Sequence, residues 1–92
     1  GLEKETEADF SENRPPSYPS QAVRQKLQGV VMLRLSVSKT GNVEKVEVVE
    51  SSGHSILDQA AISAVGKWKG KPASRWGRAT ASTEILPIRF RI

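Results

Sequence analysis

The sequence predicts an α+β domain with the element order helix, strand, strand, helix, strand (αββαβ). Three observations carry this prediction: a strand-turn-strand pattern over residues 30–50, a helical apolar stripe after residue 55, and strict apolar-polar alternation at the C-terminus. The 92 residues are enough for one small domain with a modest core. Because the chain has no cysteine, neither a disulfide nor a cysteine-built metal site is expected.

Charge divides the chain unevenly. Residues 1–14 hold five acidic and two basic side chains, whereas the whole chain has a net charge of +4, so the remainder is strongly basic. The first 14 residues also contain few large apolar side chains, too few to offset the entropy lost on ordering. We therefore expect a flexible acidic tail over residues 1–14 and a folded domain over residues 15–92.

The first helix is short and follows a proline-rich entry around Tyr18. Prolines keep this entry extended, and Ser20 is placed to cap the helix that follows. Val23 and Leu27, four residues apart, share one face of it. Gly29 is expected to end it. Tyr18 with the next proline is interpreted as an aromatic packed at the entrance of the domain.

A β-hairpin is expected next, with strands over residues 30–38 and 43–50 joined by a turn in which Gly41 takes a positive φ. The core face of its first strand would carry Val31, Leu33, Leu35 and Val37. In the second strand Val46 and Val48 share a face, but Val43 and Val49 take the opposite one. Either a bulge or a covered second face explains this, and both remain open.

The second helix is predicted from Ser55 to about Trp68. Ser55 with Asp58 three residues later resembles a capping box. The apolar stripe of this helix comprises Leu57, Ala61, Ala64, Val65 and Trp68. A loop rich in Gly, Ser, Ala and Arg then leads to the last strand.

The final strand alternates strictly from Glu84 to Ile92. Its core-facing residues would be Leu86, Ile88, Phe90 and Ile92, and its outward residues Ile85, Pro87, Arg89 and Arg91. Proline donates no ladder hydrogen bond, so Pro87 predicts an edge strand. A right-handed crossover then gives a three-stranded antiparallel sheet in the order second, first, third (2-1-3), with both helices packed on one face.

Catalytic chemistry finds little support in these residues. The single histidine, His54, has no partner at a useful spacing, and no nucleophile or phosphate-loop motif occurs. Asp58 and Glu84 are interpreted as a helix cap and a surface charge. The sequence therefore predicts no enzyme, no catalytic residue, no cofactor and no metal.

Two binding functions remain, of which the first is nucleic-acid binding by the basic second half with Trp68 and Trp76. Single-strand binders, however, place aromatics on an open sheet face, and the central strand offers none there. The second is β-augmentation, in which an extended peptide adds a strand to the open edge.

The sequence resembles the TonB C-terminal domain family over roughly residues 15–92. The residues that carry the resemblance are Tyr18-Pro19, Ala22, Gly29-Val30-Val31, Gly41-Asn42-Val43, Val46, Val48, Ser51-Ser52-Gly53, Leu57-Asp58, Ala60-Ala61, Ala64-Val65, Trp68, Pro72 and Pro87-Ile88-Arg89-Phe90. The chain departs from the family at Gly70, where many members have an aromatic, and at Trp76. A TolA-like periplasmic domain is the alternative within this class.

The resemblance implies the periplasmic gripping end of an energy transducer. Family members are anchored in the inner membrane by an N-terminal helix, absent from this chain, and driven by an ExbB–ExbD-type motor. They bind the TonB box of an outer-membrane TonB-dependent transporter by strand addition. The partner-binding residues implied here are Glu84, Ile85, Leu86, Pro87, Ile88, Arg89, Phe90, Arg91 and Ile92.

Two further expectations concern the same open edge and its charge. A strand-exchanged homodimer would use the edge itself, and no nucleic-acid partner is expected. The acidic tail would lie along the basic edge and compete with the ligand.

Overall fold

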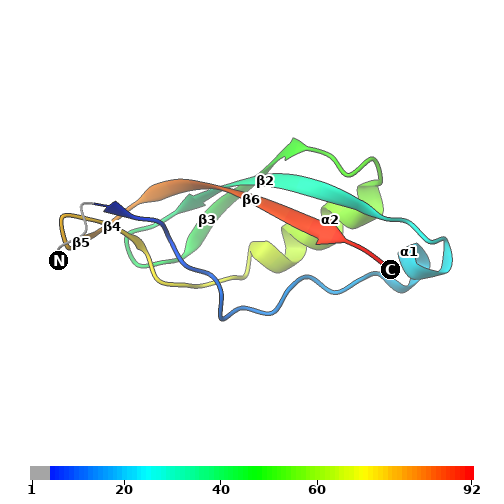
Figure 1. Ribbon diagram of the computed structural model, residues 1–92, viewed down its shortest axis with the longest axis horizontal. Helices are drawn as coiled ribbons and strands as arrows, with labels where there is room; N and C mark the ends of the chain where they lie inside the picture. Colours follow the sequence, from blue (N-terminus) through cyan, green and yellow to red (C-terminus); the bar gives the residue numbers. More distant parts are fainter. Residues whose placement is uncertain (1–4) are drawn as a thin grey trace.

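The computed structural model describes residues 5–92 as an elongated α+β chain measuring 49 × 22 × 20 Å along its principal axes (Figure 1). Its elements are β1 (Glu5–Thr6), α1 (Ser20–Arg24), β2 (Gly29–Val37), β3 (Val43–Glu50), α2 (Ser55–Val65), β4 (Ala73–Arg75), β5 (Arg78–Thr80) and β6 (Ser82–Phe90). The predicted fold class is confirmed. None of the helices in the described part is long and apolar enough to cross a membrane.

The main sheet has the strand order β3-β2-β6, with both pairings antiparallel. This is the predicted arrangement, in which the first strand of the hairpin is central and the C-terminal strand lies at an edge. β6 pairs with β2 over its whole length, from Ser82 opposite Val37 to Phe90 opposite Gly29, without a register shift. An unbroken ladder of this kind fixes which β6 side chains face the core.

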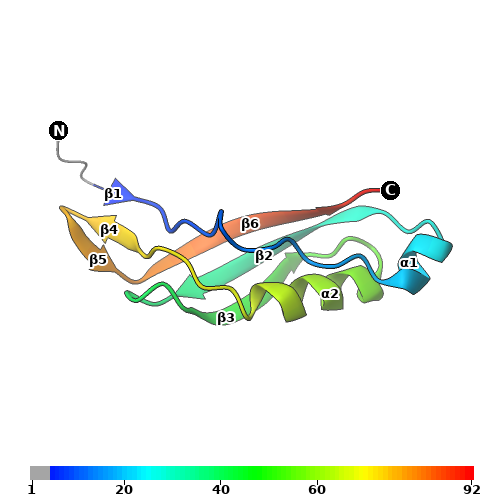
Figure 2. The ribbon, with the colours of Figure 1, turned by 90° about the horizontal axis from the view of Figure 1, so that it is seen from below.

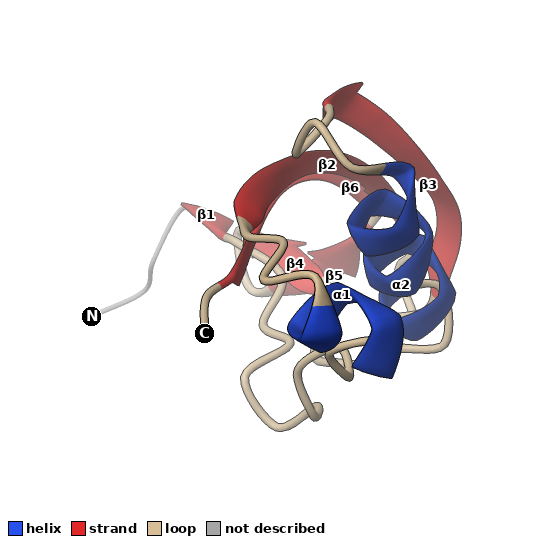
Figure 3. Ribbon diagram, turned by 90° about the vertical axis from the view of Figure 1, so that its right-hand side faces the viewer, coloured by secondary structure: helices blue, strands red, loops and turns tan. Residues whose placement is uncertain are grey.

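Both helices lie on the same side of the main sheet, as predicted (Figure 2). Seen along its length, the sheet curls around α2 (Figure 3). The enclosed core consists of Ala22, Val31, Leu33, Leu35, Val37, Leu57, Ala61, Val65, Ile88 and Phe90. Every residue predicted for the core face of the first hairpin strand is therefore buried, because period-2 alternation and one covered face determine the orientation of a strand.

The irregular second hairpin strand contains bulges. The pairing of β3 with β2 shifts register between Met32 and Leu33 and again between Ser36 and Val37. Val49 and Glu44 are thereby left without a partner, so Val48, Val46 and Val43 lie opposite the buried residues of β2. Of the two explanations that the sequence allowed, the bulge is correct.

The predicted helix caps are wrong. Ser20 and Ser55 are each the first residue of a helix, and neither α1 nor α2 has a side-chain cap at its N-terminus. The first helix ends at Arg24, so Gly29 begins β2 instead of ending α1. A β-carbon on Gly29 would lie 2.8 Å from the carbonyl oxygen of Ser52, which shows that close packing of the main chains requires glycine here.

The second helix is shorter than predicted, ending at Val65, with Gly66 as its C-cap. The backbone N–H groups of Lys67 and Trp68 donate to the carbonyls of Ala64 and Val65, three residues earlier. Bonds of this 3₁₀ type tighten the turn that follows the helix. Trp68 thus lies beyond the helix, although its half-buried ring packs against the core.

The described part of the acidic segment, for which the sequence predicted a flexible tail, pairs with other strands. β1 pairs with β4, and β4 with β5, in a second three-stranded antiparallel sheet that the sequence did not predict. Asp9 and Lys71 form a further bridge, with two backbone hydrogen bonds of 2.9 Å. Residues 1–4 of the predicted tail lie outside the described residues.

A candidate partner-binding edge

β6 is held in place by its inward side chains. Ile88 and Phe90 are 8% and 4% exposed, and the half-buried Leu86 packs against the same core. The ring of Phe90 meets that of Tyr18 edge to face, with centroids 5.4 Å apart. Burial of such side chains contributes about 1.5–3 kcal/mol each, so the strand is a firmly fixed element.

The other edge of β6 pairs with no strand among the described residues. The outward side chains Ile85, Pro87 and Arg89 are all exposed, Ile85 by 54%. Pro87 lies opposite Met32 of β2. The sequence prediction of an edge strand is thus confirmed, and an edge of this kind offers a row of backbone donors and acceptors.

The predicted binding residues from Glu84 to Ile92 do not all belong to the strand. Arg91 and Ile92 follow its end, and Ile92 is 61% exposed, so its predicted place in the core is wrong. The alternation continues past the strand in the sequence, but no β2 residue lies opposite Ile92, because that ladder ends with Gly29 and Phe90. The backbone N–H of Ile92 instead donates to the side-chain oxygen of Gln28 at 3.1 Å.

Glu84 is more than the surface charge that the sequence suggested. It lies opposite Leu35 on the core-facing side of β6 and is half-buried. Its Oε2 accepts hydrogen bonds from the backbone N–H of Ala8 at 2.9 Å and from Ser82 Oγ at 2.8 Å. This carboxylate therefore ties the acidic segment to the start of the edge strand.

The described acidic segment forms a strap, which we define as residues 5–14. In it Ala8 and Phe10 pack against the core, and Phe10 lies 6.1 Å from the Trp68 ring, centroid to centroid. The indole N–H of Trp68 donates to the carbonyl of Arg14 at 3.1 Å. The sequence predicted that the acidic segment would lie along the basic edge near Arg89 and Arg91. In the strap, Glu5 instead forms an ion pair with Arg75, at an N–O distance of 3.7 Å.

Asp58 organises the turn between β3 and α2 instead of capping the helix. Its carboxylate accepts hydrogen bonds from Ser51 Oγ, from Ser52 Oγ at 2.7 Å and from the Ser52 backbone N–H at 3.0 Å. Burial opposes ionisation of this carboxyl, but these donors outweigh that cost, so the pKa of Asp58 lies below its ordinary value of 3.8. His54, the N-cap residue of α2, accepts from the N–H groups of Leu57 and Asp58 through its carbonyl.

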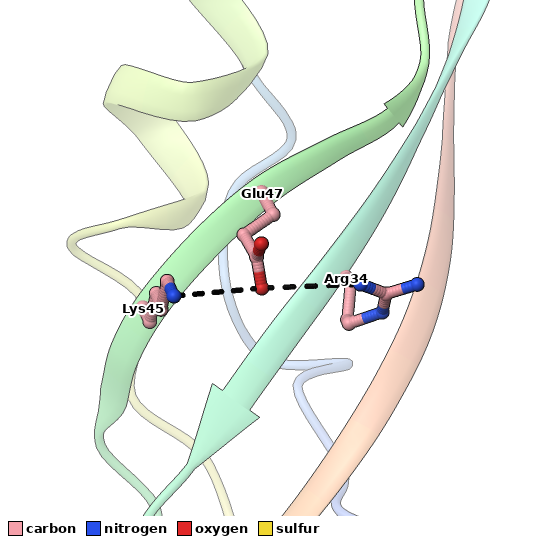
Figure 4. A network of polar contacts seen from close by, with 3 residues as sticks. All are labelled: Arg34, Lys45 and Glu47. Carbon is pink, nitrogen blue, oxygen red and sulfur yellow. Dashed lines mark ion pairs between the residues drawn. The ribbon is translucent and has the colours of Figure 1, made fainter.

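The sheet face turned away from the helices is polar near its centre. The Oε1 atom of Glu47 in β3 lies 4.0 Å from a guanidinium nitrogen of Arg34 and 3.8 Å from Nζ of Lys45, and all three side chains are at least 41% exposed (Figure 4). Exposed ion pairs of this length contribute little to stability. No aromatic from β2 lies on this face, which agrees with the sequence argument against a base-stacking platform.

Sequence reasoning missed the strap and the β4–β5 hairpin. A signal for the strap was present: Thr6, Ala8 and Phe10 are half-buried and alternate with exposed acidic residues, the period of a strand. The hairpin turns at Trp76 and Gly77, which both have positive φ. Glycine there was a visible turn signal, but a tryptophan in the left-handed region is uncommon and gave no warning.

Sequence comparisons relate this chain to known proteins. The family described as Gram-negative bacterial TonB protein C-terminal matches residues 14–92. The chain is 38% identical over 85 residues to the protein tonB2 of Pseudomonas aeruginosa, covering 92% of this chain and 32% of that protein. It is 49% identical over 80 residues to the TonB protein of Neisseria gonorrhoeae, covering 84% of this chain and 25% of that protein.

A TonB protein of Vibrio cholerae is 35% identical over 77 residues, covering 84% of this chain and 32% of its own length. The chain thus spans about a third or less of the curated relatives it matches. The family match extends from the residue before the first proline of the Tyr18 entry to the last residue, Ile92. The chain belongs to the TonB C-terminal domain family.

Proposed function

We propose that this chain is the receptor-binding end of a TonB-type energy transducer, which takes up the TonB box of an outer-membrane transporter as an added strand along β6. The observation that carries the proposal is the state of β6 itself. Its inward side chains are fixed in the core, while its second edge is unpaired among the described residues. A strand with these two properties can gain a partner strand without rearranging the fold.

The wider role follows from family membership. In a transducer of this type the parent protein would be anchored in the inner membrane and driven by an ExbB–ExbD-type proton-powered motor, and the domain would work in the periplasm. A grip on the transporter would then transmit energy for substrate uptake. Binding of this kind requires neither a catalytic group nor a cofactor.

The strength of such a grip can be bounded from the length of the edge. A docked strand would form roughly four to six backbone hydrogen bonds, each worth about 0.5–1.5 kcal/mol net. After the cost of ordering a flexible peptide, this supports an affinity on the order of micromolar. Proline in a sheet is confined to positions whose missing N–H faces away from the internal ladder, so the gap at Pro87 would fall in the docked ladder.

Titration of the uniformly ¹⁵N-labelled chain with a TonB-box peptide, followed by NMR, tests this function. Amide signals of residues 84–92 should shift most, with those of β3 unaffected. A matched titration with a single-stranded oligonucleotide provides the control. Shifts confined to residues 67–78 with the oligonucleotide, and none with the peptide, would contradict strand addition and favour nucleic-acid binding.

The same unpaired edge supports a second mode of association, a homodimer in which two chains exchange or pair their C-terminal strands. Arg89 and Arg91 oppose it, because like charges would meet across an antiparallel pair of β6 strands. Sedimentation velocity over a hundredfold concentration range tests it. If the peptide competes with dimer formation, peptide and second chain bind the same edge of β6. If the peptide binds to an intact dimer, the peptide site and the dimer interface are different surfaces.

A further inference from the structure

We propose that the strap (residues 5–14) sets the length of the docking edge, so that a partner strand pairs with β6 from Ile85 to Phe90 and stops at Glu84. The inference rests on the proposed function and adds to it the part of β6 that is available. The strap is the chain's own segment, and the limit it imposes would exclude longer strands from the start of β6.

The strap lies beside the first three residues of β6, of which Ser82 and Glu84 are half-buried and Thr83 is exposed. Glu5–Glu7, Ala73–Arg75 and Thr80–Glu84 line one pocket, so the strap and the β4–β5 hairpin flank the start of the edge strand. The hydrogen bond from Ala8 N–H to Glu84 Oε2 joins the strap to one of the residues that line this pocket. A partner strand would need to lie about 4.8 Å from β6, and at this end the strap already borders that space.

Beyond Glu84 the strap turns away from β6. Its next contacts are with the loop after α2: Asp9 bonds Lys71, and Asn13 Nδ2 donates to the carbonyl of Lys69 at 2.9 Å. The chain meets β6 again at Tyr18, whose ring packs against that of Phe90. Figure 1 shows the segment after β1 leaving β6 and passing toward α1. The stretch between Glu84 and Phe90 is therefore the accessible part of the edge.

Gly70 is what lets the strap approach. A β-carbon on Gly70 would lie 2.1 Å from the carbonyl oxygen of Asp9 and 2.8 Å from Cδ1 of Phe10, so its three nearest neighbours are strap atoms. Gly70 has no positive φ, so alanine suits its backbone, and the atoms nearest to an added β-carbon belong to the strap.

Substitution Gly70→Ala in the full chain tests the limit by displacing the strap without touching β6. Hydrogen exchange followed by NMR, with and without a TonB-box peptide, should show protection within residues 85–90 of the wild-type chain and none within residues 82–84. In Gly70→Ala the protection should extend to Ser82–Glu84, and peptide affinity should tighten about fivefold or more from the added hydrogen bonds. Ala8→Pro, which removes the donor to Glu84, should act in the same direction, and Ala8→Ser, which keeps it, should not.

A locked form supplies the opposite test. Thr6 and Ser74 are cross-strand partners with side-chain oxygens 2.6 Å apart, so Thr6→Cys with Ser74→Cys places two thiols within reach of a disulfide in a chain without cysteines. The oxidised protein should bind the peptide as the wild type does, with the same short footprint.

Three results would overturn the inference. Peptide-induced protection of Ser82–Glu84 in the wild-type chain would show that the strap sets no limit. Loss of binding on oxidation of the double-cysteine chain, restored by reduction, would show that the strap must open before docking. Absence of peptide-induced protection anywhere on β6, in all variants, would remove the proposed function itself, and this inference with it.

Discussion

Tyr18 and Phe90 pack edge to face, with an angle of 79° between ring planes, at the point where the chain entry meets the end of β6. The hydroxyl of Tyr18 donates to the carbonyl of Leu27, just before β2. One side chain thus joins the Tyr-Pro entry, the connection after α1 and the edge strand. The expectation of an aromatic packed at the domain entrance is confirmed.

Tyr18 is therefore expected to stabilise the C-terminal end of β6. Tyr18→Phe keeps the ring contact and loses one hydrogen bond, which should lower the free energy of unfolding by about 1 kcal/mol. Tyr18→Ala removes both and should cost about 2 kcal/mol or more. Urea unfolding of the two variants measures the difference. Equal losses in both would mean that the ring contributes nothing.

Phe90 and Ile92 differ in burial, although the alternation in the sequence predicts that both lie in the core. Phe90→Ala should destabilise the fold by about 3 kcal/mol, because its ring is buried and packs against that of Tyr18. Ile92→Ala should change stability by less than about 0.5 kcal/mol, because that side chain is exposed. Thermal unfolding of the pair provides the comparison. A large loss in Ile92→Ala would restore the sequence prediction.

Asp58 gives the chain a specific response to acid. Its pKa is lower in the folded state than in the unfolded state, so the carboxylate contributes its full stabilisation above the ordinary value of 3.8, and this contribution is lost as pH falls through the folded pKa. Asp58→Asn should be less stable than wild type at pH 7, and the gap should narrow below about pH 4. Urea unfolding at several pH values measures it; a gap independent of pH would contradict the account.

Asp58→Ala should be worse than Asp58→Asn at neutral pH, since it leaves the donors of Ser51 and Ser52 without their acceptor. The expected additional cost is about 1–3 kcal/mol. Unfolding free energies of the two variants under the same conditions give the comparison. If alanine and asparagine were equally tolerated, water would be satisfying these donors and the carboxylate would not be organising the turn.

Arg89 and Arg91 should influence binding of acidic peptides through long-range attraction. Both side chains are exposed, so Arg89→Gln with Arg91→Gln should slow association with an acidic TonB-box peptide several-fold at low salt and have little effect at 0.5 M salt. Stopped-flow fluorescence measures the rates. The control variant Lys45→Gln removes an exposed charge from β3, the opposite edge strand of the main sheet, and should leave the rates nearly unchanged.

Much of the main sheet could be predicted because its signals are local and periodic. Three local patterns each predicted a part of the fold: the alternation in residues 30–38, the turn at Gly41 and the apolar stripe from Leu57 to Val65. Pro87 predicted that the last strand lies at an edge of the sheet. Handedness then fixed the strand order. The bulges at Val49 and Glu44 could be suspected but not located, because a bulge depends on the partner strand.

The strap could not be predicted in the same way. Composition indicated disorder, and its few apolar side chains could find partners only once Trp68 and the loop after α2 were in place. The role of Glu84 also depends on a contact between distant parts of the sequence, since its hydrogen-bond donor Ala8 lies 76 residues away. Helix caps failed for a simpler reason: Asp58 had stronger donors available in the preceding turn than at the helix start.

The central claim is that the main chain of β6 binds the partner. It is tested most directly with two TonB-box peptides of identical sequence, N-methylated at alternate residues so that opposite backbone edges are blocked. One peptide should lose affinity at least about tenfold while the other binds as the unmodified peptide does, because only one edge faces β6. If both methylated peptides bound as tightly as the unmodified one, the grip would be made by side chains and strand addition along β6 would be contradicted.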